Sequence, residues 1–405
     1  MKKLDMVLYK YTQELAESGR AKGKEQIVTG IIKADASKGP RYLLKGSDLE
    51  YIKMNSNSYL GLSMHPEVIK AEEEAVKRFG VGPGAVRFIS GSYKIHTDLE
   101  DKLAEFHARK AAMIFSSAYM TSLGVISSLI TSETVVISDT LNHNCIINAM
   151  RMSRPLAKLI YEHNDMLDLK KKLDEAKGKG KRCLVITDGI FSMRGDHAPL
   201  ADIKKLCEQA DDHFDEGVAL IVDDSHGIGA CGKTGRGTEE LTGAKADILI
   251  GTLGKAFGVN GGYVTGSKEL ITFLRESAPT YIYSNPITVS EAAAAKKSIE
   301  ICAAEEGQNI LKHLKEMTER FRNGLTDLGY ETIPGEHPVV PLMLRDTQKT
   351  ADMVDYLQEN AILATGLNFP VVPKGEEEIR FQINADHQKD DIDQVLDVLS
   401  KFMEN

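Results

Sequence analysis

The amino-acid sequence predicts an α/β protein with a mostly parallel sheet flanked by helices and a smaller α+β C-terminal domain. Short apolar runs alternate with amphipathic helical segments between about residue 65 and residue 266, a pattern typical of parallel strands covered on both faces. From Pro286 onward, a long helical stretch is followed only by short strands and helices. We expect the ligand site of such a sheet at the carboxyl ends of its strands.

Hydrophobic periodicity gives the order of the elements. Helices are expected over 65–78, 98–107, 119–130, 143–152, 166–176 and 200–210, then over 286–328, 350–360 and 389–402. Strands are expected over 111–115, 135–138, 157–161, 183–187, 218–223, 247–251 and 262–266, then over 339–343 and 378–382. An N-terminal helix and a short irregular or hairpin segment near Lys38 precede them. The predicted domains are therefore an N-terminal segment over 1–55, a large domain over 56–285 and a small C-terminal domain over 286–405.

The composition is that of an ordinary globular protein. The 405 residues suffice for two lobes with a substantial core, and a net charge of −9 gives no footprint for nucleic acid. The five cysteines are scattered, odd in number and without CxxC spacing, which argues against a disulfide framework or a zinc site and fits a reducing cytoplasm. No stretch approaches eighteen apolar residues, so neither a signal peptide nor a membrane span is predicted.

Lys255 is the most informative residue of the chain. It follows the apolar strand 247–251 and lies between glycines, the close packing that an imine-forming lysine needs and a surface lysine does not. Asp223 ends the strand 218–223, and His226 follows three residues later. These residues are the usual set for pyridoxal phosphate: a Schiff-base lysine, a carboxylate for the pyridine nitrogen, and a histidine for the phenolic oxygen. The alternatives are an exposed loop lysine and a turn-capping aspartate, which would leave His226 unexplained.

Other strand ends carry weaker signals. The polar turn 116–122 opens a helix and could bind a phosphate, although an N-capping serine has the same pattern. Thr252 could give its hydroxyl to the phosphate, and the imidazole of His143 could stack on the cofactor ring, although a lone histidine here is more often structural. Arg380 is a lone cation inside an apolar strand and needs an anion, either a substrate carboxylate or an internal salt bridge. The basic run 177–182 is read as a solvated turn, with phosphate binding as the alternative.

Several ordered segments resemble the α-oxoamine synthases, a branch of the fold-type I pyridoxal phosphate enzymes with the aminotransferase-like fold. They are Asn57–Leu62, Val86–Ser92, Ser138–His143, Phe191–Met193, Val222–Gly229, Gly235–Gly237, Gly251–Lys255, Tyr283–Pro286 and Arg380. The resemblance covers about residues 50 to 400. Arg194 departs from the family pattern, which usually has an acidic residue at this position.

The resemblance implies a role for each matching residue. Lys255 would form the imine, Asp223 would bind the pyridine nitrogen, His143 would stack on the ring, Ser192 and His226 would contact the phenolic oxygen, and Ala118, Tyr119 and Thr252 would line the phosphate. Ser284 and Asn285 would reach the phosphate of the other subunit, which implies a homodimer with shared active sites. Asn57 and Arg380 would hold the carboxylate of the amino-acid substrate. No metal is implied.

The implied reaction is the condensation of an amino acid with an acyl-CoA. Segments 86–91 and 283–286 are most similar to family members that join glycine and acetyl-CoA to 2-amino-3-oxobutyrate, or run the reverse cleavage in threonine breakdown. The stretch 255–262 has the spacing of members that make 8-amino-7-oxononanoate from alanine and a longer acyl-CoA. An aminotransferase on the same fold and a non-enzymatic, cofactor-binding sensor module are the other hypotheses. We expect a cytoplasmic enzyme without nucleic-acid or membrane partners.

Overall fold

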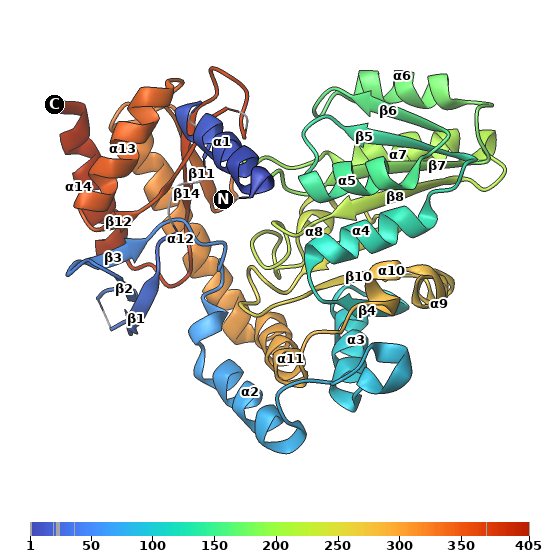
Figure 1. The fold of residues 1–405 in the computed structure, drawn as a ribbon, viewed down its shortest axis with the longest axis horizontal. Coiled ribbons are helices and arrows are strands. Elements are labelled where there is room, and N and C mark those ends of the chain that lie inside the picture. The colour runs from blue at the N-terminus through green and yellow to red at the C-terminus, as the bar shows by residue number, and fades with distance from the viewer. Residues whose placement is uncertain (1, 19, 22–24, 36, 370, 405) are drawn as a thin grey trace.

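A computed structural model describes the chain except residues 1, 19, 22–24, 36, 370 and 405, some of which fall in the predicted N-terminal segment. Figure 1 shows a large α/β lobe and a smaller lobe, with the helices α11 (Val289–Ala303) and α12 (Glu305–Asp327) running from one toward the other. The predicted α/β class, with a mostly parallel sheet flanked by helices and a smaller C-terminal sheet, is confirmed. The three domain ranges stay a prediction.

The large lobe is built on a seven-stranded sheet with the order β4-β10-β9-β8-β7-β5-β6. Its strands are β4 (Ala111–Phe115), β5 (Thr134–Asp139), β6 (Ala157–Tyr161), β7 (Arg182–Asp188), β8 (Val218–Asp223), β9 (Ile248–Thr252) and β10 (Gly262–Gly266). The strands from β9 to β6 pair in parallel, and β10 is antiparallel to both of its neighbours. Most of these strands are buried along their length because helices cover both faces of the sheet.

The register of this sheet brings polar strand ends to one edge. Asp188 pairs with Asp223 across β7 and β8, and Asp223 pairs with Ile250 of β9. At the same edge, Gly262 allows β10 to approach the first turn of α4 (Ala118–Leu129), since a Cβ atom at this glycine would lie 2.4 Å from the Ala118 backbone. The start of one helix and the ends of several strands therefore meet at a single place.

The helices of the large lobe agree with the prediction to within a few residues. They are α2 (Pro66–Phe79), α3 (Lys94–Phe106), α4, α5 (Asn144–Ser153), α6 (Met166–Ala176) and α7 (Leu200–Ala210). The structure adds the helices α8 (Thr238–Thr242), α9 (Lys268–Ser277) and α10 (Pro279–Ile282), which the sequence did not predict. The last two are short and lie directly before the segment expected to reach another subunit.

The prediction of one continuous helix over 286–328 is wrong. The chain forms α11 and α12, and Ala304 between them has an extended backbone with φ −92° and ψ 175°. The break has a packing reason: α11 packs against α2 and α3 of the large lobe, whereas α12 packs against α14 (Lys389–Glu404) and β11 (Val339–Met343) of the small lobe. No proline marks the break, so periodicity alone did not reveal it.

Two sheets form the small lobe. One has the antiparallel order β11-β14-β13, with β14 (Glu378–Gln382) between β11 and β13 (Thr365–Leu367). In the other, β1 (Val28–Ile32) and β2 (Arg41–Leu44) form the expected hairpin, and β3 (Glu50–Lys53) pairs in parallel with β12 (Ile362–Leu363). The helices are α13 (Thr347–Glu359) and α14. The N-terminal strands thus complete the C-terminal lobe.

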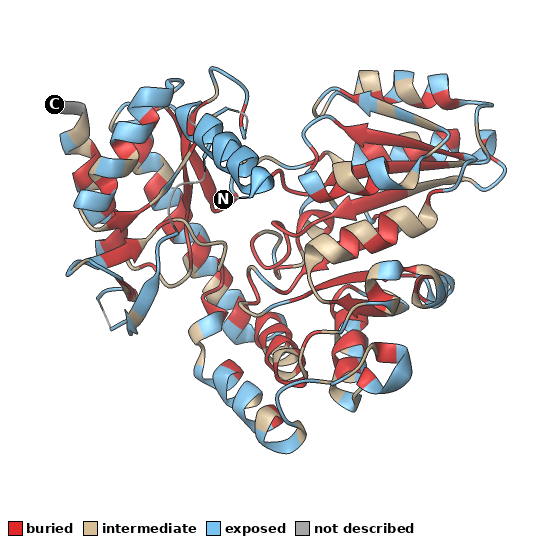
Figure 2. Ribbon diagram, in the orientation of Figure 1, coloured by how far each residue is buried: buried red, intermediate tan, exposed pale blue. Residues whose placement is uncertain are grey.

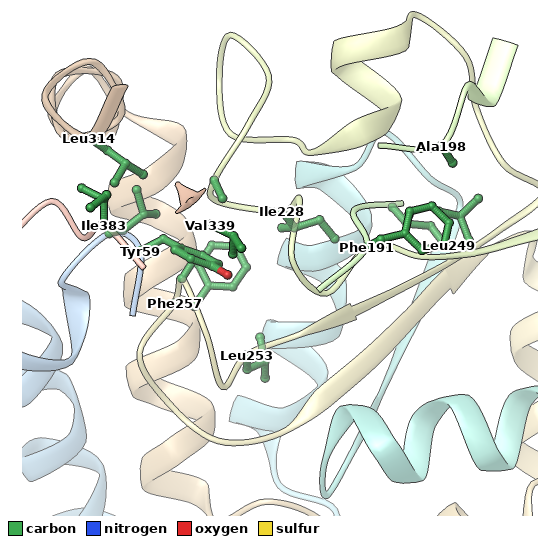
Figure 3. Close-up of a cluster of buried hydrophobic side chains, with 14 of the residues drawn as sticks. Tyr59, Phe191, Ala198, Ile228, Leu249, Leu253, Phe257, Leu314, Val339 and Ile383 are labelled. Carbon is green, nitrogen blue, oxygen red and sulfur yellow. The ribbon is translucent and has the colours of Figure 1, made fainter. Parts of the chain in front are cut away.

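One hydrophobic cluster joins the two lobes. Figure 3 shows part of it, from Phe191 and Leu249 of the large lobe to Val339 and Ile383 of the small lobe. The predicted N-terminal helix is present as α1 (Lys3–Glu17), which is exposed along its whole length (Figure 2). Among the described residues, no helix is both long and apolar enough to cross a bilayer.

Candidate active site

Lys255 lies just after β9, and its side chain lines a small cavity at the polar edge of the large sheet. The lining residues are Ala118, Tyr119, His143, Cys145, Asp188, Ile190, Ser192, Asp223, Ser225, His226 and Lys255. Segments far apart in the sequence, including the strand ends of β7 and β8 and the first turn of α4, therefore supply one site. Most of the predicted cofactor-binding residues of this subunit meet here.

Asp223 is held as a hydrogen-bond acceptor on both carboxylate oxygens. Its Oδ2 accepts from Ser122 Oγ at 2.8 Å and from Cys145 Sγ at 3.7 Å. Its Oδ1 accepts from the backbone N–H and the hydroxyl of Ser225, at 3.2 and 2.5 Å. These donors fix the orientation of the Asp223 carboxyl group, whose place in the cavity suits the pyridine nitrogen of the cofactor.

The amine of Lys255 is prepared for chemistry by its surroundings. Burial lowers the pKa of Lys255 to about 8, against the opposing charges of Asp223 and Asp188. Among the described residues, its Nζ atom has no hydrogen-bond or ion-pair partner. A desolvated amine with this pKa is partly neutral near pH 7, so it can attack an aldehyde or accept a proton.

His143 caps the start of α5 and reaches the cavity. Its Nδ1 accepts from the backbone N–H of Cys145 at 3.3 Å, and its own backbone N–H donates to Asp188 Oδ2 at 2.9 Å. Burial lowers the pKa of His143, which favours the neutral imidazole suited to stacking on a ring. Burial, reinforced by the charge of Asp223, raises the pKa of Asp188 well above its ordinary value.

His226 is fixed from two sides. Its Nδ1 lies 2.7 Å from the Tyr59 hydroxyl, and its backbone carbonyl accepts from His337 Nε2 at 2.8 Å. Burial lowers the pKa of His226 well below its ordinary value, so the ring is neutral. Tyr59 and His337 are far apart in the sequence; Tyr59 holds the imidazole of His226, and His337 holds its backbone.

Arg380 and Asn57, the predicted carboxylate-binding pair, lie together. The Arg380 guanidinium donates from Nε to the Ser192 carbonyl at 2.6 Å and from Nη2 to Asn57 Oδ1 at 3.4 Å. Arg380 is only 9% exposed, yet no described carboxylate lies within ion-pair distance of it. The internal salt bridge that the sequence left open is therefore absent among the described residues, and the buried cation is available to an anionic ligand.

The remaining predicted residues are more dispersed. Ala118 and Tyr119 begin α4, whose N-cap hydroxyl of Ser117 accepts from Met120 N–H at 3.2 Å, so this helix start faces the cavity. Thr252 lies outside the cavity lining, and its hydroxyl contacts Gly254 N–H and the Gly261 carbonyl. Ser284 and Asn285 follow α10 and are also absent from the lining.

Several functional residues were missed from the sequence. Asp188 ends β7 as Asp223 ends β8, so the same strand-end signal was available for it. Cys145 and Ser225 lie two residues from predicted histidine and aspartate positions, but nothing in their local pattern marks them. Tyr59 reaches His226 only through tertiary packing. No cluster of metal-ligating side chains is present in the described part of the chain.

A charged network supports the loop that carries Ser192. His163 Nδ1 lies 3.1 Å from Asp139 Oδ1, and its Nε2 lies 3.1 Å from Asp196 Oδ2. Burial favours the neutral ring, but the hydrogen bonds and charges of Asp139 and Asp196 outweigh it and raise the pKa of His163 to about 9. This ring packs at an angle of 84° against the ring of Phe191, the residue before Ser192, with the ring centroids 4.3 Å apart.

Residues 50–399 match the family described as Aminotransferase class I and II. The 2-amino-3-ketobutyrate coenzyme A ligase of Bos taurus, a mitochondrial protein, is 39% identical over 391 residues, which cover 95% of this chain and 90% of that protein. The 8-amino-7-oxononanoate synthase of Thermosipho melanesiensis is 38% identical, with 86% and 88% covered. The solved serine palmitoyltransferase of Sphingomonas wittichii has a TM-score of 0.88 at 26% identity, with 99% and 97% covered.

The chain belongs to the class I and II aminotransferase family. Within that family, the predicted membership of the α-oxoamine synthases is confirmed by these relatives. The predicted cofactor, pyridoxal 5′-phosphate, is likewise confirmed. The residues present fit this group, because a carboxylate held by donors, an unpaired desolvated amine and a helix start line one cavity.

The His163 network predicts a pH dependence of stability. Because the pKa of about 9 lies above the ordinary value of 6.5, the charged ring stabilises the fold fully below pH 6.5, and this contribution is lost as the pH rises through 9. The thermal unfolding midpoint of the His163→Gln variant should therefore fall less steeply between pH 7 and about 9 than that of the wild type. The exposed His213→Gln is the control; equal slopes in all three proteins would contradict the assignment.

Proposed function

We propose that the protein is a pyridoxal phosphate-dependent acyltransferase that condenses glycine with acetyl-CoA to 2-amino-3-oxobutyrate and CoA, or catalyses the reverse cleavage. The similarity to 2-amino-3-ketobutyrate coenzyme A ligases over 95% of the chain supports this reaction, as do the matching segments 86–91 and 283–286. Threonine breakdown is the process in which such a cleavage would serve. All five cysteines are free thiols, in agreement with the cytoplasmic location that we propose.

One observation carries the proposal. The desolvated amine of Lys255 and the Asp223 carboxyl group line one cavity, and the buried Arg380 guanidinium of the small lobe has no described carboxylate partner. The first two groups suit the cofactor, and the third suits the carboxylate of a substrate. Since pyridoxal phosphate condenses with amines, an amino acid can react with the cofactor through its amino group and bind Arg380 through its carboxylate.

We assign the cofactor contacts as follows. Lys255 would hold the aldehyde, Asp223 the ring nitrogen, His143 the ring face, Ser192 and His226 the phenolic oxygen, and Ala118, Tyr119 and Thr252 the phosphate. When bound, pyridoxal phosphate supplies an electron sink for the α-carbon of the amino acid.

The protein's own groups then position the substrate and move the proton. Arg380 and Asn57 orient the amino-acid carboxylate, and the free Lys255 amine takes the α-proton, for which a pKa of about 8 is well matched. The new C–C bond joins the α-carbon to the thioester carbonyl carbon. The C–S bond breaks, and CoA leaves as its thiol after taking up a proton.

We also propose a homodimer with shared active sites. Ser284 and Asn285 lie outside the cavity of their own chain, so a role at the cofactor phosphate requires a second subunit. The neighbouring Tyr283 is 81% exposed, and Phe88 and Ile89 are 66% and 68% exposed. Large apolar side chains of this kind are typical of a surface that another chain covers.

A substrate panel tests the reaction. With glycine and acetyl-CoA, the purified enzyme should release free CoA thiol, and the rate should fall as the acyl chain is lengthened. Faster release with alanine and a longer acyl-CoA would instead favour an 8-amino-7-oxononanoate synthase, since a relative of that name has a comparable identity of 38% to this chain. Amino transfer to a 2-oxo acid without thiol release would favour an aminotransferase and contradict the proposal.

The Arg380→Ala variant tests the carboxylate site. Removing one partner of a buried, charge-assisted contact should lower kcat/KM for glycine about 100-fold, while the cofactor absorbance is retained. Arg320→Ala is the matched control, because Arg320 pairs with Asp393 on the surface of the small lobe. Full activity in Arg380→Ala would contradict the assigned role, whereas loss of activity with retained colour argues against a sensor module.

A further inference from the structure

Arg194 lies on the loop after β7, which lines the cavity through Ser192 and also contacts the small lobe. It replaces the acidic residue expected from the resemblance, and it follows Ser192 by two residues. The loop is a tight turn, in which the Phe191 carbonyl accepts from Gly195 N–H at 2.8 Å and Phe191 N–H donates to the Asp196 carbonyl at 2.9 Å. Arg194 and Ser192 therefore belong to one hydrogen-bonded turn.

This turn touches the small lobe at three places. The Ser192 carbonyl accepts from Arg380 Nε at 2.6 Å. Gly195, with φ +72°, lies so close to β11 that a Cβ atom on it would be 2.7 Å from the Val339 carbonyl oxygen. Arg194 donates from Nη1 to Glu376 Oε2 at 3.5 Å, while its Nε binds Asp196 on the turn itself at 3.1 Å. Among these contacts, only the one made by Arg194 pairs opposite charges across the lobes.

The small lobe also places a buried carboxyl group, that of Glu378, near Arg194. Glu378, the first residue of β14, is 2% exposed, and its Oε1 is buried without a hydrogen-bond partner in the described structure. Burial raises the pKa of Glu378 to about 8, and the charges of Arg380 and Arg194 oppose that rise. Glu378 and Arg380 are two residues apart on β14 and so share one face of the strand.

We propose that Arg194 is a positioning residue for substrate binding, which pairs with Glu376, two residues before β14, and so holds the Ser192 turn on Arg380. The Ser192 carbonyl then keeps the Arg380 guanidinium aimed at the substrate carboxylate. The inference rests on the proposed carboxylate-binding role of Arg380. It accounts for a cation at position 194, since an acidic side chain there would face Asp196, Glu376 and Glu378.

Glycine binding, read from the change in cofactor absorbance, tests this role. In Arg194→Gln the Kd for glycine should rise about three- to fivefold, the worth of one partly exposed ion pair, with kcat little changed. Arg194→Lys should stay near the wild-type Kd, because it keeps the charge. Arg194→Glu should bind more weakly than Arg194→Gln, and Glu376→Arg in the same chain should restore much of the affinity.

Hydrogen exchange gives a second readout that does not depend on turnover. Exchange in segments 190–197 and 374–380 should become faster in Arg194→Gln and should recover in the charge-reversed pair. The control, Arg320→Gln, removes an ion pair within the small lobe and should change neither segment nor the Kd. An unchanged Kd in Arg194→Gln, or no recovery in the Arg194→Glu, Glu376→Arg pair, would overturn the inference. If glycine binding is weakened in Arg380→Ala but unchanged in Arg194→Gln, the positioning role of Arg194 is wrong while the proposed function still holds.

Discussion

The site depends on one electrostatic arrangement: the amine of Lys255 and the carboxyl group of Asp223 line the same desolvated cavity. Burying a charged amine or carboxylate costs free energy, because the group loses its hydration, unless hydrogen bonds or opposite charges replace the lost water. Donors from α4 and from the turn after β8 stabilise the Asp223 carboxylate. Burial also lowers the pKa of Lys255 to about 8, so part of the lysine population is neutral and can react as an amine.

The parallel sheet makes this arrangement possible. The carboxyl ends of β7, β8 and β9 lie side by side, so Asp188, Asp223 and the Lys255 loop meet without long connections. The small lobe then adds the groups that a parallel sheet lacks. Its Arg380 brings a guanidinium to the Ser192 carbonyl and also contacts Asn57, and a shared hydrophobic cluster packs the two lobes against each other (Figure 3).

The sequence predicts those parts of the molecule that depend on a local pattern. The strands of the large sheet are short apolar runs, and Lys255, Asp223 and His226 lie where such runs end, so the strands and these three site residues could be predicted. The break at Ala304 could not, because it is imposed by what α11 and α12 pack against. Tyr59 and His337 were missed for the same reason, since they reach His226 from distant segments. Arg380 was recognised as an unusual buried cation, but only the structure shows that no described carboxylate pairs with it.

The attachment of the cofactor is the most direct measurement of the central claim. Borohydride reduction of the loaded enzyme fixes pyridoxal phosphate covalently to the amine that holds it, and peptide mass spectrometry then identifies that amine. The added mass should appear on Lys255 alone, and it should be absent from the Lys255→Ala variant, which should still fold. Label on another lysine, with Lys255 unmodified, would show that Lys255 does not hold the cofactor.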